Sequence, residues 1–303
     1  MGEIKFAILI TTRNRLNDLV TTLNKTKELF VRQDVEFIIC DDGSTDETSN
    51  FIETNYKTVK LIKNQKSKGL IFSRNRLLNL TKAKYAITLD DDAHIISKNP
   101  LEIIEAFFQS NKKCGVMAFR IFWGKILPEN LNHTLVNTRV KGFVGCGHVW
   151  RMDTWRMLPN YPDWFVFYGE EEFASYQLFK NNWEVYYLPD ILVHHRVDIK
   201  SRKKDNDYQT RLRRSLRSGW YLYFLFYPKN EIPKRFLYTL WVQFKIKVFK
   251  GDFKAFVAIV QAIVDVVINI PRLIKNANRL SKKELSEYSK LPETKLYWTP
   301  ERN

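Results

Sequence analysis

The sequence predicts an α/β protein, with a mostly parallel sheet flanked by helices and a helical, basic C-terminal region. Short apolar runs alternate with amphipathic stretches over residues 4–89, and polar clusters follow three of these runs. The charge is uneven, because residues 1–199 carry 26 Lys and Arg against 24 Asp and Glu, whereas residues 200–303 carry 23 against 9. We therefore expect an α/β domain at 1–199 and a distinct region at 200–303.

The first 90 residues contain four short apolar segments that we predict to be buried strands, at residues 4–10, 35–40, 59–62 and 85–89. Three helices are predicted between them. Residues 16–30 carry apolar side chains at helical spacing, Ser44 or Thr45 can cap the second helix, and residues 69–80 form the third. Strands that alternate with helices in this way are typical of a parallel sheet.

Polar clusters follow three of these strands, at the edge of the sheet where ligands of parallel sheets bind. The clusters are Thr11-Thr12-Arg13, Asp41-Asp42 and Asp90-Asp91-Asp92. Alternation along the last strand would point Asp90 and Asp92 to the same side, about 7 Å apart. Because two such carboxylates repel each other, they suit a divalent cation such as Mg²⁺ or Mn²⁺, and that cation could carry a diphosphate.

Beyond residue 100 the alternation becomes less regular. The predicted elements are a helix at 100–110, a strand at 115–123, a glycine-rich segment at 142–151, a helix that ends near residue 181 and a strand at 183–188. The acidic run Glu170-Glu171-Glu172 precedes the second of these helices, where negative charge suits either a helix N-terminus or a general base. The pair His194 and His195 follows the last strand.

The C-terminal third combines aromatic side chains with positive charge. Residues 220–227 are strongly aromatic, and residues 255–270 are predicted to form a helix with a narrow polar stripe, ended by Pro271. We expect this region to bind an anionic membrane surface, with a helical bundle or a homo-oligomer as the alternative. Nucleic acid is not an expected partner, because no nucleic-acid-binding motif is visible.

Two further expectations concern membranes and targeting. No run of 18 uninterrupted apolar residues is present, so no transmembrane helix is predicted. The charged residues Glu3 and Lys5 argue against a signal peptide. The cysteines Cys40, Cys114 and Cys146 form no metal-type pair and are expected to be reduced in a cytosolic compartment.

An ordered set of motifs over residues 4–196 resembles glycosyltransferase family 2, a group of inverting enzymes with the GT-A fold, which is Rossmann-like. The matching segments are ILITTRNR, IICDDGSTDET, KGLIFSRNRLL, ITLDDDAHI, GFVGCGHVWR and YGEEEFASYQLFKNNWEVYYLPDILVHH. The order and spacing of these segments carry the resemblance, because DDD alone is a weak signal.

The resemblance implies roles for the matching residues. A nucleotide-sugar donor would be held by Thr11, Thr12, Arg13, Asp41, Asp42, Arg74, Asp90 and Asp91. The metal, Mn²⁺ or Mg²⁺, would be bound by Asp90, Asp92 and one or both of His194 and His195. The family's general base matches Glu171, although the run of three glutamates leaves Glu170 and Glu172 open. Apart from the resemblance, residue type makes His148, Trp150 and Trp164 candidate acceptor-site residues, with packing in the core as the alternative for each.

The expected protein is therefore a metal-dependent, inverting glycosyltransferase of the hexosyltransferase type. Its acceptor would be a glycan or a lipid-linked sugar, in bacterial cell-surface polysaccharide synthesis, and the enzyme would be peripheral on the cytoplasmic face of the membrane. The donor stays open between UDP-hexose, dTDP-rhamnose and GDP-mannose. One alternative is a non-catalytic module of the same fold that binds a nucleotide-sugar or a membrane. The other is a nucleotidyltransferase, although TTRNR lacks the glycines of a phosphate loop.

Overall fold

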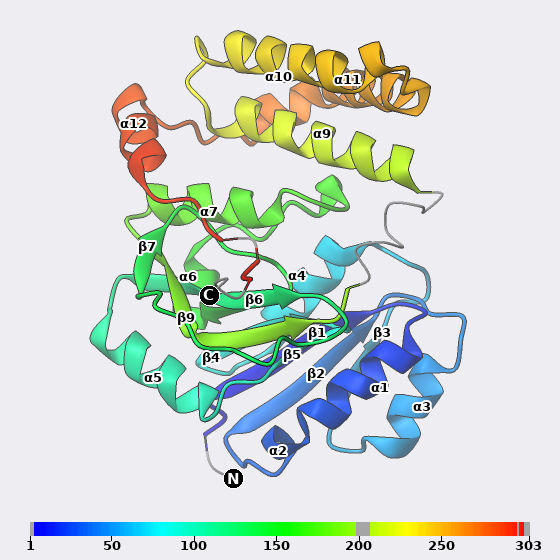
Figure 1. The fold of residues 1–303 in the computed structure, drawn as a ribbon, viewed down its shortest axis with the longest axis vertical. Helices are drawn as coiled ribbons and strands as arrows, with labels where there is room; N and C mark the ends of the chain where they lie inside the picture. Colours follow the sequence, from blue (N-terminus) through cyan, green and yellow to red (C-terminus); the bar gives the residue numbers. More distant parts are fainter. Residues whose placement is uncertain (1–2, 198–206, 296, 300–303) are drawn as a thin grey trace.

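The computed structural model describes residues 3–197, 207–295 and 297–299. Within these residues, nine strands form one sheet in the order β3-β2-β1-β4-β8-β6-β9-β5, and β7 pairs with β9 (Figure 1). The strands are β1 (Phe6–Thr12), β2 (Val35–Asp41), β3 (Lys60–Lys63), β4 (Tyr85–Asp90), β5 (Ala93–Ile95), β6 (Cys114–Trp123), β7 (Thr138–Val140), β8 (Gly147–Arg151) and β9 (Glu184–His195).

Helices cover both faces of this sheet and form a further layer beyond it (Figure 1). In the first part of the chain they are α1 (Leu16–Lys25), α2 (Lys27–Phe30), α3 (Thr48–Asn55), α4 (Leu70–Leu80), α5 (Pro100–Ser110), α6 (Met152–Met157), the 3₁₀ turn η1 (Asp163–Phe165) and α7 (Glu170–Lys180). In the C-terminal part they are α9 (Tyr208–Phe226), α10 (Ile232–Ile246), η2 (Val248–Lys250), α11 (Phe253–Lys275) and α12 (Lys282–Lys290).

The parallel register brings the predicted polar clusters together. Strands β3, β2, β1 and β4 are parallel, and β8 then runs antiparallel to β4. Thr11 pairs with Asp90 on one side of β1, and Thr12 pairs with Asp41 on the other. All three clusters therefore end at one edge of the sheet, as the sequence predicts.

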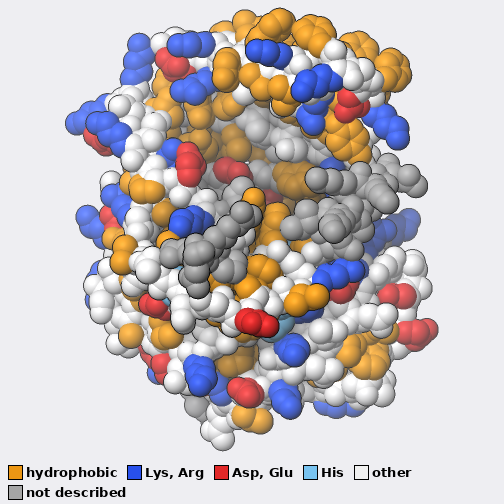
Figure 2. Space-filling view, in the orientation of Figure 1, with side chains coloured by type: hydrophobic (Ala, Val, Ile, Leu, Met, Phe, Trp, Pro, Cys, Tyr) orange, Lys and Arg blue, Asp and Glu red, His pale blue; other side chains and the backbone are white. Residues whose placement is uncertain are grey.

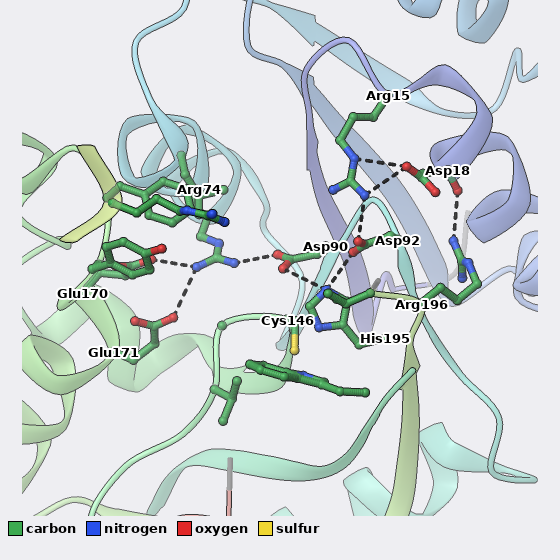
Figure 3. A pocket seen from close by; sticks show the side chains of 18 of the residues that line it. Arg15, Asp18, Arg74, Asp90, Asp92, Cys146, Glu170, Glu171, His195 and Arg196 are labelled. Carbon is green, nitrogen blue, oxygen red and sulfur yellow. Dashed lines mark hydrogen bonds and ion pairs between the residues drawn. The ribbon is translucent and has the colours of Figure 1, made fainter. Parts of the chain in front are cut away.

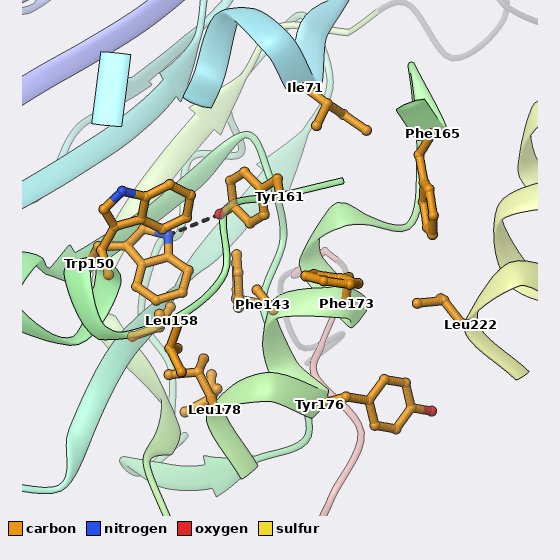
Figure 4. Packing of buried hydrophobic residues seen from close by; sticks show 14 of the residues in the cluster. Ile71, Phe143, Trp150, Leu158, Tyr161, Phe165, Phe173, Tyr176, Leu178 and Leu222 are labelled. Atoms are coloured by element: carbon orange, nitrogen blue, oxygen red, sulfur yellow. Dashed lines mark hydrogen bonds between the residues drawn. The ribbon is translucent and has the colours of Figure 1, made fainter. Parts of the chain in front are cut away.

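Alternation along β1 divides the core into two clusters. Ile8 packs with α1, α3 and α5 on one face, while Leu9 packs with α4, α6 and α7 on the other. The second cluster extends through Trp150, Phe165 and Phe173 to Leu222 of α9 (Figure 4). The C-terminal helices thus share a hydrophobic core with the sheet. The predicted boundary at 199/200 falls outside the described residues.

Two predicted helix boundaries are wrong. Neither Ser44 nor Thr45 caps α3, which begins at Thr48. The Ser44 hydroxyl accepts a hydrogen bond from the backbone N–H of Asn14, and the Thr45 N–H donates to the Asn14 side chain, so this loop is bound to the end of β1 instead. Likewise, α11 continues through Pro271 to Lys275, which lets Leu273 become fully buried.

The last strand is longer than predicted. β9 runs from residue 184 to residue 195 rather than stopping near residue 188. The pairing of β9 with β6 shifts near Pro189, which has no N–H to donate to the ladder. Phe119 of β6 pairs with Leu188, whereas the next residue, Arg120, pairs with Leu192. The irregularity lets β9 continue to His195, at the edge of the sheet that carries the polar clusters.

Candidate active site

Two adjoining cavities lie at this edge of the sheet, beneath α9. The main cavity has a volume of about 770 Å³ and is lined by the residues of Figure 3, among them Arg74, Asp92, Glu171 and His195. The second cavity, of about 490 Å³, extends over the ends of β1 and β4 and the loop before α4. The residues that line both are Arg15, Leu70, Asp90, Asp92, Phe167, His195 and Arg214.

The aspartates that follow β4 lie in a dense ionic network. Arg15 contacts Asp91 and Asp92, each at 2.7 Å, and Thr12 donates a hydrogen bond of 2.9 Å to Asp91. Burial raises the pKa of Asp91 to about 7, although Arg15 opposes this shift. Burial would raise the pKa of Asp92 as well. The contacts with His195 and Arg15 outweigh this effect and hold the pKa of the Asp92 carboxyl well below its usual range. Asp92 is therefore an ionised carboxylate at neutral pH.

Asp90 and His195 lie close enough together to hold a divalent cation, and Asp92 contacts His195 beside them. Nε2 of His195 lies 2.9 Å from Asp92 and 3.9 Å from Asp90. One ligand atom from each of Asp90, His195 and Cys146 falls within a 4.8 Å cluster. Carboxylate oxygens and an imidazole suit Mn²⁺ or Mg²⁺. Burial raises the pKa of the Cys146 thiol, so this residue stays neutral and is a poor ligand for a hard cation.

The structure brings only one of the two predicted histidines to this cluster. Because side chains alternate along β9, His194 points to the other face of the sheet, where its Nε2 lies 2.7 Å from the carbonyl of Gly124. Its ring packs against His94 and Phe122. His195 is thus the histidine placed to bind a metal.

Arg74 connects the aspartates to the glutamates of α7 (Figure 3). Its guanidinium lies 2.7 Å from Asp90, 2.8 Å from Glu170 and 3.5 Å from Glu171. Arg74 and Glu170 are almost fully buried. A Cβ atom at Gly145 would overlap the ends of the Glu171 and Arg74 side chains, so any other residue here would have to displace this pair. This explains one glycine of the glycine-rich segment.

The three glutamates at the start of α7 have different surroundings. Glu170 is buried against Arg74, and burial together with Glu171 raises its pKa. Glu171 lines the main cavity with 20% of its side chain exposed, and burial raises its pKa while Arg74 opposes the shift. Glu172 instead lines a separate cavity beside Tyr176 and Tyr288. Glu170 and Glu171 thus both line the main cavity, and Glu171 is the more exposed of the two.

The predicted donor residues after β1 and β2 divide into two groups. Thr11, Thr12 and Arg13 line the second cavity, and the Thr11 hydroxyl has no hydrogen-bond partner among the described residues. Asp41 does not line either of the two cavities in the part of the chain that the structure describes. Its carboxylate accepts hydrogen bonds from the Ser44 N–H and the Ser49 hydroxyl. Asp41 therefore shapes the loop after β2 rather than facing a ligand.

Asp42 lines the second cavity, but its carboxylate is occupied by the protein itself. It accepts five hydrogen bonds, from the side chains of Asn64, Ser67 and Ser73 and from the backbone N–H groups of Lys68 and Gly69. These bonds outweigh burial and lower its pKa. Asp42 thus organises the loop before α4 and with it the wall of the second cavity.

We expect Asp42→Ala to lower the free energy of unfolding by about 3 kcal/mol, because five donors lose their partner. Because the folded-state pKa of Asp42 is lowered, its contribution is present at neutral pH and is lost as the pH falls through that value. Urea denaturation of Asp42→Ala, with Glu47→Ala as an exposed control in the same loop, measures the change. Equal unfolding midpoints for both variants would contradict this role.

Two of the candidate acceptor residues are fully buried, the third packs partly buried against the hydrophobic core, and in the described chain none of them lines either cavity, so these predictions are corrected. His148 is fully buried on β8, which lowers its pKa to about 3, and its Nδ1 lies 3.1 Å from the carbonyl of Val144. The indole N–H of Trp150 donates to the hydroxyl of Tyr161 at 2.9 Å. Trp164 packs against Phe165 and Tyr221. All three were inferred from residue type alone, which does not distinguish a core aromatic from a sugar-binding one.

Several cavity residues were missed by the sequence interpretation. Trp123, at the end of β6, lines the main cavity with its ring against that of His195, at a centroid distance of 5.7 Å. Further missed residues that line one or both cavities include Arg15, Asp18, Lys125, Cys146, Phe167, Tyr168, Arg196, Arg211 and Arg214. Trp123 is the last residue of a predicted strand, and that position could have signalled it.

The loop before α7 has an unusual backbone. Val166 and Tyr168 have φ angles of 68° and 71°, which are disfavoured for side chains with a Cβ and above all for a β-branched one. Helix α9 holds this loop, because Arg217 donates to the carbonyl of Phe165 and Ser218 to that of Phe167. The strained segment carries Phe167 to the junction of the two cavities.

The sheet is mixed, its strand-end aspartates face a buried arginine and a helix-borne glutamate, and this architecture is that of the GT-A class of glycosyltransferases. Comparison with known proteins supports the same assignment. A family model described as Glycosyl transferase family 2 matches residues 7–175, which is more than half of the chain, and the chain belongs to that family. The fold class and the family expected from the sequence are both confirmed.

Solved glycosyltransferase structures share the fold at low sequence identity. GalNAc-T7 in complex with UDP, GalNAc and Mn²⁺ is 13% identical with a TM-score of 0.63, over 89% of this chain and 58% of that one. The chain thus spans little more than half the length of GalNAc-T7. Residues 1–349 of S. aureus TarS with UDP-GlcNAc are 16% identical with a TM-score of 0.56, over 90% and 84% of the two chains.

A third similar structure is the mannosyltransferase PcManGT from Pyrobaculum calidifontis with GDP-Man and Mn²⁺. It is 13% identical with a TM-score of 0.54, over 95% of this chain and 79% of that one. None of the curated proteins compared with the sequence matches it. At such identities the likeness establishes the GT-A fold and leaves the donor and acceptor to be inferred from the site.

Proposed function

We propose that the protein is a metal-dependent, inverting glycosyltransferase of the hexosyltransferase type, which transfers a sugar from a nucleotide-sugar to an acceptor hydroxyl. The observation that carries this proposal is the continuous link from Asp92 and His195 through Asp90 and Arg74 to Glu171 within one cavity. This link supports a metal site near Asp90 and His195 and a general base at Glu171, both lining the same cavity.

The proposed chemistry assigns a task to each side chain. Asp90, Asp92 and His195 would hold Mn²⁺ or Mg²⁺, which when bound supplies positive charge against a leaving diphosphate. Glu171 accepts the proton of the acceptor hydroxyl as that oxygen attacks the anomeric carbon. Arg74 orients Glu171 and adds a buried positive charge. Attack from the side opposite the diphosphate inverts the anomeric configuration.

The proposed donor occupies the second cavity and the proposed acceptor the main one. Thr11, with its unpartnered hydroxyl, together with Thr12 and Arg13 would face the nucleoside part of the donor. Trp123 in the main cavity provides an aromatic surface for an acceptor sugar, the role that the sequence had suggested for Trp150 and Trp164. The nucleoside of the donor can be uridine, deoxythymidine or guanosine, and the transferred sugar is not assigned.

Donor binding and product stereochemistry test the proposal. A thermal-shift panel of UDP, dTDP and GDP with and without Mn²⁺ should raise the melting temperature for one base, and more strongly with the cation. NMR of the product of the matching nucleotide-sugar should show the inverted anomer. Retained configuration would contradict inversion, and binding without transfer to any acceptor would favour a non-catalytic nucleotide-sugar-binding module.

The C-terminal helices present an apolar surface, which we call the α10–α11 face (Figure 2). Its exposed large side chains are Leu237, Tyr238, Trp241, Ile246, Phe249, Phe253, Phe256, Val260, Val264, Val267, Ile268 and Ile274. Residues 232–275 carry eight Lys and Arg but only two acids, Asp252 and Asp265. Both acids are engaged within the protein, since Asp252 caps α11 and Asp265 pairs with Arg213. The charge left at this face is therefore positive.

We propose that this face lies on an anionic membrane, where the acceptor is lipid-linked, at the cytoplasmic side during bacterial cell-surface polysaccharide synthesis. In the described residues, α11 is the one helix whose 23-residue length and apolar composition would allow it to cross a bilayer. That differs from the sequence expectation, which counted only uninterrupted apolar runs. Its contacts with α9, including the Asp265–Arg213 pair of 2.6 Å, favour a helix lying in the membrane surface instead.

Vesicle flotation tests the membrane proposal. The protein should float with anionic vesicles, less so in high salt, and a Trp241→Asp/Phe253→Asp variant should lose this binding. The matched control is Ile126→Asp/Val136→Asp, which changes exposed apolar residues away from α10 and α11. Equal flotation of both variants would overturn the proposal. A concentration-dependent dimer lost in the first variant alone would assign the face to a second copy.

A further inference from the structure

Helix α9 lies between the cavities and α11, and one of its faces is anchored to α11. Arg213 contacts Asp265 through two nitrogens, at 2.7 and 2.6 Å, and Arg217 lies 3.6 Å from the same carboxylate. The hydroxyl of Tyr221 donates to the backbone carbonyl of Asp265 at 3.0 Å. Positions 213, 217 and 221 repeat every four residues, so they form one stripe of the helix.

A second stripe of α9 faces the cavities. Asp207, at the N-cap, and Arg211 and Arg214 line the main cavity, and Arg214 lines the second cavity as well. Arg211 is paired with Asp207 at 3.0 Å. Arg214 is partly buried and forms no ion pair or hydrogen bond with any residue that the structure describes. A helix outside the family-matched segment therefore contributes a guanidinium to the junction of the two cavities.

The other cations at this junction are already neutralised. Among the described residues, Arg15, His195 and Arg214 are the basic side chains that line both cavities. Arg15 is held by Asp91 and Asp92, and His195 by Asp92. A guanidinium in a confined space, without a carboxylate of its own, is suited to bind a phosphate group in bidentate fashion.

We propose that Arg214 binds a phosphate group of a substrate at the junction of the two cavities. The proposal rests on the proposed function and extends it to a residue that no motif predicted. In the first arrangement the phosphate belongs to the donor diphosphate, and Arg214 stabilises the charge that forms as the bond to the anomeric carbon breaks. In the second it belongs to a phosphate that joins the acceptor sugar to its lipid. In both arrangements Arg214 contacts the phosphate directly.

Binding measurements on the full-length protein with Mn²⁺ test this. Arg214→Ala should weaken the binding of pyrophosphate and of the matching nucleoside diphosphate by about ten- to hundredfold, while the nucleoside binds equally well. Arg214→Lys keeps the positive charge but loses the planar guanidinium, so its affinity for pyrophosphate should lie between those of the wild type and Arg214→Ala. Arg156→Ala, an exposed arginine that lines neither cavity in the described chain, is the control. Circular dichroism melting verifies that each variant is folded.

Transfer kinetics separate the two sources of the phosphate. If nucleoside diphosphate binding is unchanged but KM rises for a phosphate-bearing acceptor and not for its phosphate-free analogue, Arg214 serves the acceptor. If neither binding nor KM changes in a folded Arg214→Ala variant while the wild type binds and transfers normally, the proposal is overturned and the proposed function stands. If the wild type binds no nucleotide and no pyrophosphate, both are overturned.

Discussion

Replacing Glu171 by Gln should reduce sugar transfer by about 100- to 10,000-fold, because the amide cannot accept the proton of the attacking hydroxyl. Donor binding should change little, since Gln keeps the size of the side chain and Glu171 lies in the main cavity, away from the predicted nucleoside-binding residues. Steady-state kinetics with isothermal titration of the nucleoside diphosphate separate the two effects. A Glu171→Gln enzyme with wild-type kcat would show that another residue is the base.

The matched control is Glu172→Gln, one residue further along α7. Glu172 lines a separate cavity, so its replacement should leave kcat within a factor of about two. The pH profile gives an independent readout. Burial raises the pKa of Glu171, and the base must be ionised, so kcat should fall as the pH decreases through that raised value. This acidic limb should disappear from the residual activity of Glu171→Gln.

Arg74→Met should abolish transfer and also destabilise the protein by about 3–5 kcal/mol. The reason is that it leaves Glu170 and Asp90 without their cation, and Glu170 is almost fully buried. Urea denaturation measures the loss of stability, and transfer assays below the unfolding transition measure activity. Arg74→Lys should recover part of the stability but little activity, because one ammonium cannot contact three carboxylates in the same geometry.

A second substitution identifies the source of that instability. Adding Glu170→Gln to Arg74→Met removes the buried charge, so the double variant should be more stable than Arg74→Met alone. Activity should not return, because Glu171 is still without its arginine. If Arg74→Met unfolds at the wild-type urea concentration, the ionic link from Asp90 to α7 does not stabilise the fold.

Periodicity and strand order made much of the fold predictable. The apolar runs of β1, β2, β3 and β4 alternate with helices, and parallel pairing forces their polar ends to one edge. Asp90, Asp91 and Asp92 could be placed there without any coordinates. The C-terminal end of α11 could not be predicted in this way. A proline such as Pro271 usually ends a helix, but here burial of Leu273 outweighs that tendency, and a tertiary contact of this kind cannot be read from the local sequence.

The candidate site was predictable where the backbone alone fixes a side chain's direction. Alternation along β9 separates His194 from His195, but a sequence does not show at which residue the pairing with β6 shifts. Loop carboxylates are harder still. Asp42 resembles a ligand-binding residue until the donors from residues 64–73 are seen to surround it. Arg214 is some 120 residues from the aspartates, and only the packing of α9 places it above them.

The shared core of α9 and the sheet has a practical consequence for dissecting this enzyme. Trp220, Leu225 and Phe226 are buried in the same cluster as Trp150 and the other aromatics of β8 and α7. Cutting the chain after residue 199 would expose that aromatic surface to water, and the remaining fragment should aggregate. The proposed membrane binding and the proposed sugar transfer therefore have to be separated by single side-chain changes in the intact polypeptide, because severed halves would not keep this core.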